Sequence, residues 1–339
     1  RGLGDVYKRQ VLVVGGEFSD IGGAVLGDTY LPNTAANNLA TFDVTLPGWT
    51  DIGGGLLDGG VFALTTYDFA DPGAGREAQP EGTPPLDQVL DPYDAPISVI
   101  IGGEFTGGVT TFDGQDLIDL IFSSPSRIPT SGFVDGPVYS LQVFNDNDPD
   151  GPNGPKEAAS VIVMGGLFNN AGDQSGVGNL VKFGRVGTGA SADPASPNYD
   201  PSLIWETMTA AGGGTEGGFI ATGAVLAMTV WDPPDINNTP LAPVLVIGGD
   251  FSGIGGQAAG NIGSYGNLTP NSPAPGALLA LFGPGANGIV RTLATIVGGD
   301  DQEPSIASNL RTGNPQDPLY LGGDFTEVQF DPQAPPIQA

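Results

Sequence analysis

VLVVGGEF, residues 11–18, decides the fold of this chain. A short apolar run rich in β-branched residues is typical of a strand, and a Gly pair marks a place where the backbone bends or bulges. The chain then repeats this stretch four more times, as SVIIGGEF at 98–105, SVIVMGGLF at 160–168, PVLVIGGDF at 243–251 and PLYLGGDF at 318–325. A strand signature that recurs along one chain predicts a repeat architecture.

Three further strand patterns accompany the Gly-Gly-x-Phe strand in a fixed order. An alternating strand precedes it at 61–68, 138–146, 225–232 and 289–297. A short aromatic strand follows it at 38–43, 109–114, 179–184 and 261–266. A weaker strand that runs into glycines comes last, at 49–55, 203–214 and 277–285. This order predicts an all-β fold, a β-propeller or an incomplete propeller arc built from four-stranded antiparallel blades.

The Gly-Gly-x-Phe residues have an expected structural role. We expect the glycines to permit a bend where a side chain would collide with its neighbour. We expect the phenylalanines to fill the space between successive blades; they are Phe18, Phe105, Phe168, Phe251 and Phe325.

The repeats define the expected domain organisation. Residues 11–330 are predicted to form one β-propeller repeat domain, with units at about 11–60, 61–137, 138–224, 225–288 and 289–330. Residues 1–10, RGLGDVYKRQ, look like the translation of a sequencing-library adapter, so we expect a non-native scar and a signal peptide lost with the true N-terminus. Residues 331–339 are expected to be a truncated tail.

Composition excludes several classes of function. The net charge is −28, with only 10 Lys and Arg, so nucleic acid and anionic lipid would be repelled. The chain has no Cys and no His, which excludes disulfides, Cys/His zinc sites and Ser-His-Asp catalysis. No apolar run in the sequence approaches the length of a membrane span, so no membrane insertion is expected.

The repeat pattern resembles a known family. The order V-x-A-L-x-V-F-D, L-x-V-G-G-x-F, G-G, N-I-A-x-W-D, L-G-x-G is similar to the kelch-like and delta-sixty-like repeats of secreted bacterial proteins. The resemblance covers nearly all of 11–330 and is closest at 244–266 and 11–23. Gly263 stands where those repeats usually have Ala, and Tyr265 where they have Trp. The resemblance implies a β-propeller repeat protein of the extracellular space or the cell surface, usually without assigned chemistry.

The sharpest candidate site is a metal loop at 145–157, NDNDPDGPNGPKE. Its spacing follows D-x-[DN]-x-[DN]-G-x5-E, in which alternate carboxylates and a distal Glu surround Ca²⁺. The candidate ligands are Asp146, Asp148, Asp150 and Glu157. Predicted strands flank the loop in place of helices, so it is similar to the calcium-binding hairpin loops of integrin-type propellers. Asn153 stands where an apolar anchor is usual, and a metal-free acidic turn is the alternative.

Two weaker patterns bear on ligands. Gly283, Gly285 and Gly288 spell G-x-G-x-x-G, but a dinucleotide site needs a helix next, and 289–297 has a strand pattern. Trp49, Trp205 and Trp231 are candidates for stacking on sugar rings, although aromatics at repeat positions more often lie in a core.

We therefore expect a non-enzymatic, secreted or cell-surface repeat protein that acts as a binding or scaffolding module. Its ligand would be a protein or a glycan, and any recognition would lie in the loops. The alternative is a carbohydrate-binding or carbohydrate-active β-propeller with structural calcium. A nucleotide-binding enzyme is a third hypothesis, which fails if 289–297 is a strand. The sequence leaves the oligomeric state open.

Overall fold

The structure is a computed structural model, and it describes seventeen stretches of the chain. They are 11–22, 25–26, 29–30, 33–43, 48–52, 57–67, 98–112, 117–118, 134–145, 160–172, 174–184, 204–208, 220–231, 244–266, 285–295, 319–329 and 337–338. The regular elements in these stretches are all β-strands, so the predicted all-β fold is confirmed for them. A search of the same stretches finds no helix that could cross a membrane.

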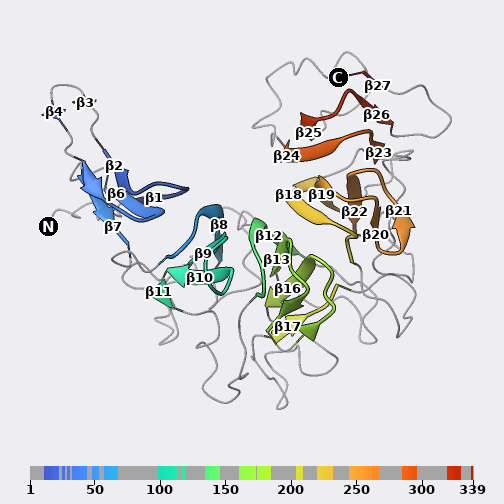
Figure 1. Ribbon diagram of the computed structural model, residues 1–339, viewed down its shortest axis with the longest axis horizontal. Helices are drawn as coiled ribbons and strands as arrows, with labels where there is room; N and C mark the ends of the chain where they lie inside the picture. The colour runs from blue at the N-terminus through green and yellow to red at the C-terminus, as the bar shows by residue number, and fades with distance from the viewer. Residues whose placement is uncertain are drawn as a thin grey trace, which may run out of the picture.

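Five antiparallel sheets follow one another along the chain, each within one of the expected units (Figure 1). Sheet 1 contains β1 (Val11–Gly15), β6 (Leu39–Asp43) and β7 (Gly48–Asp51). Sheet 2 contains β8 (Val61–Tyr67), β9 (Ser98–Gly103), β10 (Val109–Phe112) and β11 (Leu117–Ile118). Sheet 3 contains β12 (Val138–Asn145), β13 (Ser160–Gly166), β16 (Leu180–Gly184) and β17 (Ile204–Glu206).

Sheets 4 and 5 continue the series. Sheet 4 contains β18 (Ala224–Trp231), β19 (Val244–Asp250) and β22 (Ile262–Tyr265). Sheet 5 pairs β24 (Ile289–Thr295) with β25 (Leu319–Asp324). A small sheet beside it joins β23 (Gly285–Ala286), β26 (Glu327–Gln329) and β27 (Ile337–Gln338). The stretch 331–339, expected as a tail, therefore contributes a strand.

Four short hairpins add to these sheets and were not predicted from the sequence. They are β2 (Asp20–Ile21) with β5 (Thr34–Ala35), β3 (Val25–Leu26) with β4 (Thr29–Tyr30), β14 (Asn170–Ala171) with β15 (Gln174–Ser175), and β20 (Gly253–Ile254) with β21 (Gln257–Ala258). Their strands have two residues each, which is too short for an alternating pattern to be visible.

The predicted strands mostly occur where the patterns placed them. The alternating strands are β8, β12, β18 and β24, and the Gly-Gly-x-Phe strands are β1, β9, β13, β19 and β25. Of the weaker fourth strands, β7 and β17 form, whereas the one expected at 277–285 lies outside the described residues except for Gly285. Because β24 occupies 289–295, the helix that a dinucleotide site requires is missing there, and that hypothesis is wrong.

The Gly pair permits a close approach between consecutive sheets. A Cβ on Gly102 would lie 2.7 Å from Cγ1 of Val138, the first residue of the next unit's first strand, and one on Gly248 would lie 2.6 Å from the same atom of Val290. Opposite each such Gly, the first strand of the same sheet carries a β-bulge. The predicted role of the glycines is correct, and the bulge lies in the partner strand.

Four apolar clusters lie between consecutive sheets. Phe105 lies in the cluster of sheets 1 and 2, Phe168 in that of sheets 2 and 3, and Phe251 in that of sheets 3 and 4. Each of the three is buried, as the sequence predicted for them. Phe18 and Phe325, in the two end sheets, are only half-buried. The core of the molecule is thus divided among the junctions between sheets.

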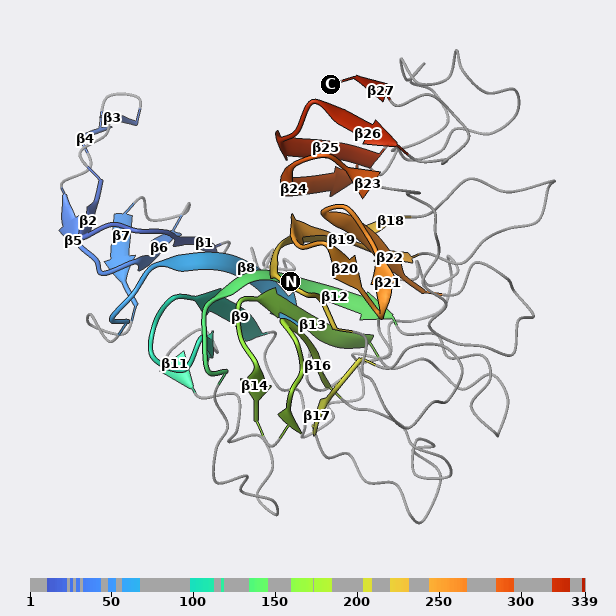
Figure 2. The same ribbon diagram turned by 45° about the vertical axis from the view of Figure 1, so that its right-hand side comes forward.

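The sheets are arranged as an open arc (Figures 1 and 2). In Figure 1, β8, β12, β18 and β24 follow one another on its concave side, and β11 and β17 lie on its outer side. The described sheets do not close into a ring, so the β-propeller assignment stays a prediction.

Candidate functional site

The predicted calcium loop cannot be placed. Asp146, Asp148, Asp150 and Glu157 lie outside the described residues. On either side of them, Asn145 of β12 pairs with Ser160 of β13, so the segment joins two antiparallel strands as expected. Within the described stretches, no three Asp or Glu residues gather in a way that could hold a metal ion. Calcium binding stays a prediction.

The tryptophans differ in their surroundings. Trp205 is only 5% exposed and packs against Phe183, with ring centroids 4.9 Å apart, in the cluster of sheets 2 and 3. Trp231 packs against the cluster of sheets 4 and 5. Trp49 contacts Phe42 at the same 4.9 Å but is only half-buried. Trp205 is therefore a core residue, as the alternative interpretation expected, and does not stack on a sugar.

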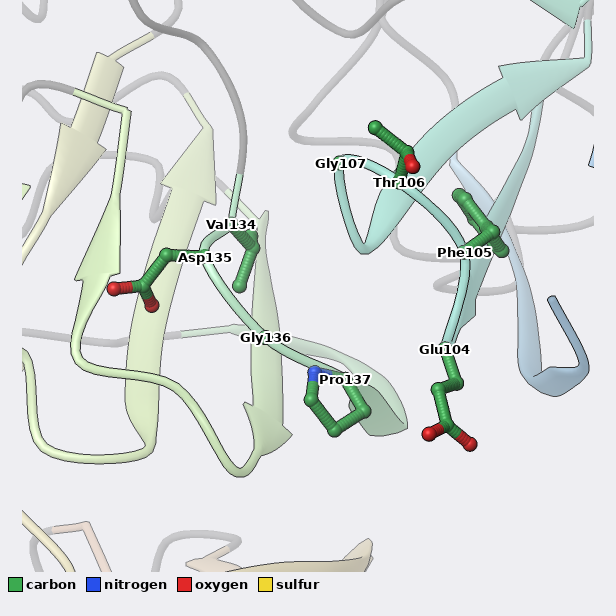
Figure 3. Close-up of a pocket in the computed structure, with 8 residues that line it drawn as sticks. All are labelled: Glu104, Phe105, Thr106, Gly107, Val134, Asp135, Gly136 and Pro137. Carbon is green, nitrogen blue, oxygen red and sulfur yellow. The ribbon is translucent and has the colours of Figure 1, made fainter. Parts of the chain in front are cut away.

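An open hollow of about 350 Å³ lies between sheets 2 and 3 (Figure 3). Two segments line it, 104–107 after β9 and 134–137 before β12. Its two carboxylates, on Glu104 and Asp135, point away from one another (Figure 3). A glycosidase-type mechanism needs two carboxyl groups directed at one bond, so this hollow does not provide an acid/base pair.

Asp135 holds a turn in place. Its Oδ1 accepts hydrogen bonds from the backbone N–H groups of Asn169 at 2.8 Å and Asn170 at 2.9 Å, and its Oδ2 accepts one from Asn170 Nδ2 at 2.6 Å. Partial burial raises the pKa of Asp135, but the hydrogen bonds from Asn170 and Asn169 outweigh it, so that the pKa lies below its ordinary value. The group is thus a structural acceptor and not a proton donor at neutral pH.

The same contact recurs in four units, and we name it the turn clamp. A short polar side chain lies three residues before the first Val of the first strand of a sheet. It accepts hydrogen bonds from the backbone N–H groups that come just after the Phe of Gly-Gly-x-Phe in the same sheet. The acceptors are Asp58 for Thr106, Asp135 for Asn169 and Asn170, Thr222 for Ser252 and Gly253, and Asn287 for Thr326 and Glu327. Sequence reasoning missed these residues because Asp, Thr and Asn do not look like one motif.

A second missed position is an asparagine in left-handed conformation. Asn38, Asn179 and Asn261 have φ of 68°, 70° and 58°, and each accepts a hydrogen bond at Oδ1 from the N–H of the Gly-Gly-x-Phe phenylalanine. In unit 2, Gly108 occupies this place with φ of 68°. Asn tolerates positive φ better than other non-Gly residues. The signal was present in the sequence, since Asn opens three of the four aromatic strands.

The exposed positions beside this framework vary from unit to unit, and we call them the variable row. They are the x residue of Gly-Gly-x-Phe and the residue after the first Val of the first strand. All nine members are exposed or half-exposed. Eight of them are apolar or acidic, and the ninth is an arginine. The members are Glu17, Phe62, Glu104, Tyr139, Leu167, Leu226, Asp250, Arg291 and Asp324.

Members of the variable row influence one another across the junctions. The rings of Phe62 and Tyr139, from sheets 2 and 3, lie 5.5 Å apart. Burial and the charge of Glu104 both raise the pKa of Tyr139. Arg291 donates from Nε to Asp324 Oδ2 at 2.8 Å, which raises the pKa of the guanidinium, and the charge of Asp250 on sheet 4 raises it further. Members of the row thus interact across the junction of sheets 2 and 3 and across that of sheets 4 and 5.

Comparison with known proteins adds no further residues to this site. No family model matches the chain, and neither the curated proteins nor the solved structures contain a match. The candidate site therefore rests on the chain's own repeats, and the kelch-like resemblance stays a prediction.

Proposed function

We propose that the chain is an arc of a β-propeller with four-stranded blades, and that it serves as a non-enzymatic binding or scaffolding module at the cell surface or outside the cell. The observation that carries this proposal is the contrast between the framework and the variable row. The glycines, the phenylalanines and the turn clamp recur from unit to unit, while the exposed row beside them changes. Repeat proteins commonly bind through such variable positions on a constant scaffold.

The chemistry of the variable row favours a partner with basic and apolar side chains. Glu17, Glu104 and Asp250 offer exposed carboxylates, while Phe62 and Leu167 offer exposed apolar surface. The cation of the row, Arg291, is already paired with Asp324. With a net charge of −28, the protein also attracts cations over a distance. A protein segment that combines Lys or Arg with an apolar side chain meets these requirements.

The test is to select random peptides on the immobilised full chain and measure their binding by fluorescence anisotropy. We expect the enriched peptides to be basic and apolar, and to bind more weakly as salt rises. Phe62→Ala with Tyr139→Ala should weaken them about tenfold, the usual loss at an aromatic hot spot. The matched control is Tyr320→Ala, an exposed aromatic outside the row. Equal loss in the control, or no enrichment, contradicts the proposal.

A second candidate function is a carbohydrate-binding or carbohydrate-active propeller with structural calcium. The paired ends of the acidic segment, Asn145 and Ser160, favour it because they bring both ends of a candidate Ca²⁺ loop together. A polysaccharide array, read for both binding and cleavage, separates it from the first: cleavage would establish an enzyme, and glycan binding without peptide binding would favour this alternative.

We expect Ca²⁺ to raise the thermal midpoint of the chain, because an ion that binds only the native state stabilises it by mass action. The rise should be absent in a variant with Asp148→Ala and Asp150→Ala, and a chelator should abolish it in the parent. A parent that melts cooperatively with no response to Ca²⁺ would show that the acidic segment is only a turn.

A further inference from the structure

A glycine follows the clamping side chain in each of the four turn clamps. These glycines are Gly59, Gly136, Gly223 and Gly288. A Cβ on any of them would collide with the backbone carbonyl oxygen of the x residue of Gly-Gly-x-Phe in the same sheet. The close approach of the two backbone segments therefore requires Gly at this place, whichever residue forms the clamp.

In sheet 5 this requirement creates an Asn-Gly pair, because the clamping residue there is Asn287. The side-chain amide of Asn reacts most readily with the next backbone nitrogen when that residue is Gly, which has no side chain to shield the nitrogen. The sequence contains Asn-Gly at 153–154 and 287–288 only, and the first pair lies outside the described residues. Asn287 is exposed, so water reaches its side chain.

The clamp of Asn287 repeats the contacts of the Asp58 clamp. Oδ1 of Asp58 accepts from the N–H of Thr106 at 2.7 Å, and Oδ1 of Asn287 accepts from that of Thr326 at 3.0 Å. Oδ2 of Asp58 accepts a second bond from the Thr106 hydroxyl at 2.6 Å. Nδ2 of Asn287 instead donates to the Thr326 hydroxyl at 3.0 Å. Since a hydroxyl either donates or accepts, Thr326 is able to hold a carboxylate as Thr106 does.

We propose that Asn287 is a site of spontaneous deamidation, and that the turn clamp accepts the aspartate that results. The Gly288 nitrogen attacks Cγ of Asn287, the Cγ–Nδ2 bond breaks, and Nδ2 leaves as ammonia with the proton of the Gly288 nitrogen. Water then opens the succinimide ring. Opening at Cγ leaves an aspartate, and opening at the main-chain carbonyl leaves an isoaspartate. Water is the one co-reactant, and this inference does not depend on the proposed function.

The hydrogen bonds of the clamp set the rate of this reaction. Oδ1 of Asn287 also accepts from the N–H of Glu327 at 3.1 Å, so the side chain must leave three donor or acceptor partners before Cγ reaches the Gly288 nitrogen. These bonds are exposed, and local opening of the turn is enough to break them. We expect Asn287 to deamidate more slowly in the folded than in the unfolded chain. It should still react faster than the left-handed asparagines, each of which precedes Leu or Ile.

The first experiment follows the reaction itself. The full chain is incubated at mildly alkaline pH in water enriched in heavy oxygen, digested with a protease and mapped by mass spectrometry, so that label marks only deamidation during incubation. We expect the peptide with Asn287 to take up label in the folded chain and to do so faster in urea. The matched control is Asn287→Thr, which keeps a clamping side chain, as Thr222 does in sheet 4, and has no amide. A peptide that takes up label in urea but not in the folded chain overturns the proposed site.

The second experiment tests whether the clamp accepts the product. Asn287→Asp should fold and melt at a temperature no lower than that of the parent at neutral pH, because an ionised carboxylate is a stronger acceptor than an amide. Aged parent, separated by ion exchange into unmodified and deamidated fractions, should show the same midpoint for its aspartate fraction as Asn287→Asp. A midpoint of Asn287→Asp below that of both the parent and Asn287→Thr overturns the proposed fit of the product.

Discussion

At the scale of the residue, one physical task is carried out by chemically different side chains. Asp58, Asp135, Thr222 and Asn287 all clamp the turn that follows the Phe of Gly-Gly-x-Phe. They share a short side chain with an acceptor oxygen, which is what a backbone N–H group requires. The repeat therefore keeps the acceptor and not the residue type, and the position is hidden from a search for identical letters.

Asp135 allows a direct test of the turn clamp. Asp135→Ala should lower the stability of the sheet 2–sheet 3 region by about 1 kcal/mol, the typical net value of such hydrogen bonds. Asp135→Asn should cost less, since Asn287 fills the equivalent place before the first strand of sheet 5. Chemical denaturation at neutral pH measures both. Equal losses for Ala and Asn would contradict an acceptor role.

The same residue gives an expected pH dependence. The hydrogen bonds hold the folded-state pKa of Asp135 below its ordinary value of 3.8, despite the opposing effect of burial. Its contribution is therefore complete above the unfolded pKa and is lost as the pH falls through the lower folded value. Asp135→Asn, which does not titrate, should show a smaller loss of thermal midpoint in acid than the parent.

At the scale of the element, the fold depends on strands approaching closely at glycines. In the first four pairs, the first Gly lies against the first Val of the next unit, as at Gly165 and Val225. The need for Gly at this position cannot be seen from its own strand, because the side chain that would clash belongs to the neighbouring sheet. The Gly pair thus recurs in the sequence because each sheet packs closely on the next one at that position.

Gly165→Ala should destabilise the protein by about 1–3 kcal/mol, as overpacking of a close contact usually does. Val225→Ala removes Cγ1, the atom that the new methyl group would meet most closely, so the double variant should be more stable than the sum of the two single losses predicts. A double-mutant cycle by denaturant unfolding measures this coupling. Strictly additive losses would mean that the contact is relieved by movement of the sheets.

At the scale of the whole molecule, stability is distributed along a stack. Each sheet contacts its neighbours through an apolar cluster, so the internal sheets have two covered faces and the end sheets have one. In such quasi-one-dimensional proteins, stability is close to a sum of unit and nearest-neighbour terms.

Hydrogen exchange should therefore be slowest in β13 and β19, which lie inside the stack, and faster in β1 and β25 at its ends. The reason is that local opening of an end sheet breaks one junction, whereas opening of an internal sheet breaks two. Exchange measured by mass spectrometry in the monomeric state tests this gradient. Uniform protection of all four strands would show that the arc unfolds as one unit.

Much of the fold could be predicted because strands are local patterns. The β-branched runs placed the strands up to Gly-Gly-x-Phe, and the β24 pattern was enough to argue against a helix after Gly288. The short hairpins and β11 were not predicted, since strands of two residues show no periodicity in the sequence. The candidate calcium residues lie outside the described residues and remain predictions on their spacing alone.

By itself the sequence determined the strand class, the order of strands within a unit and the recurrence of units, because each depends on neighbouring residues in the chain. Only the tertiary structure decided which Val meets which Gly, which polar side chains clamp turns, and that Trp205 is core while Trp49 is half-exposed. The two tryptophans lie in similar local patterns. What distinguishes them is whether another sheet covers the face, and burial of that kind depends on contacts between units far apart in the chain.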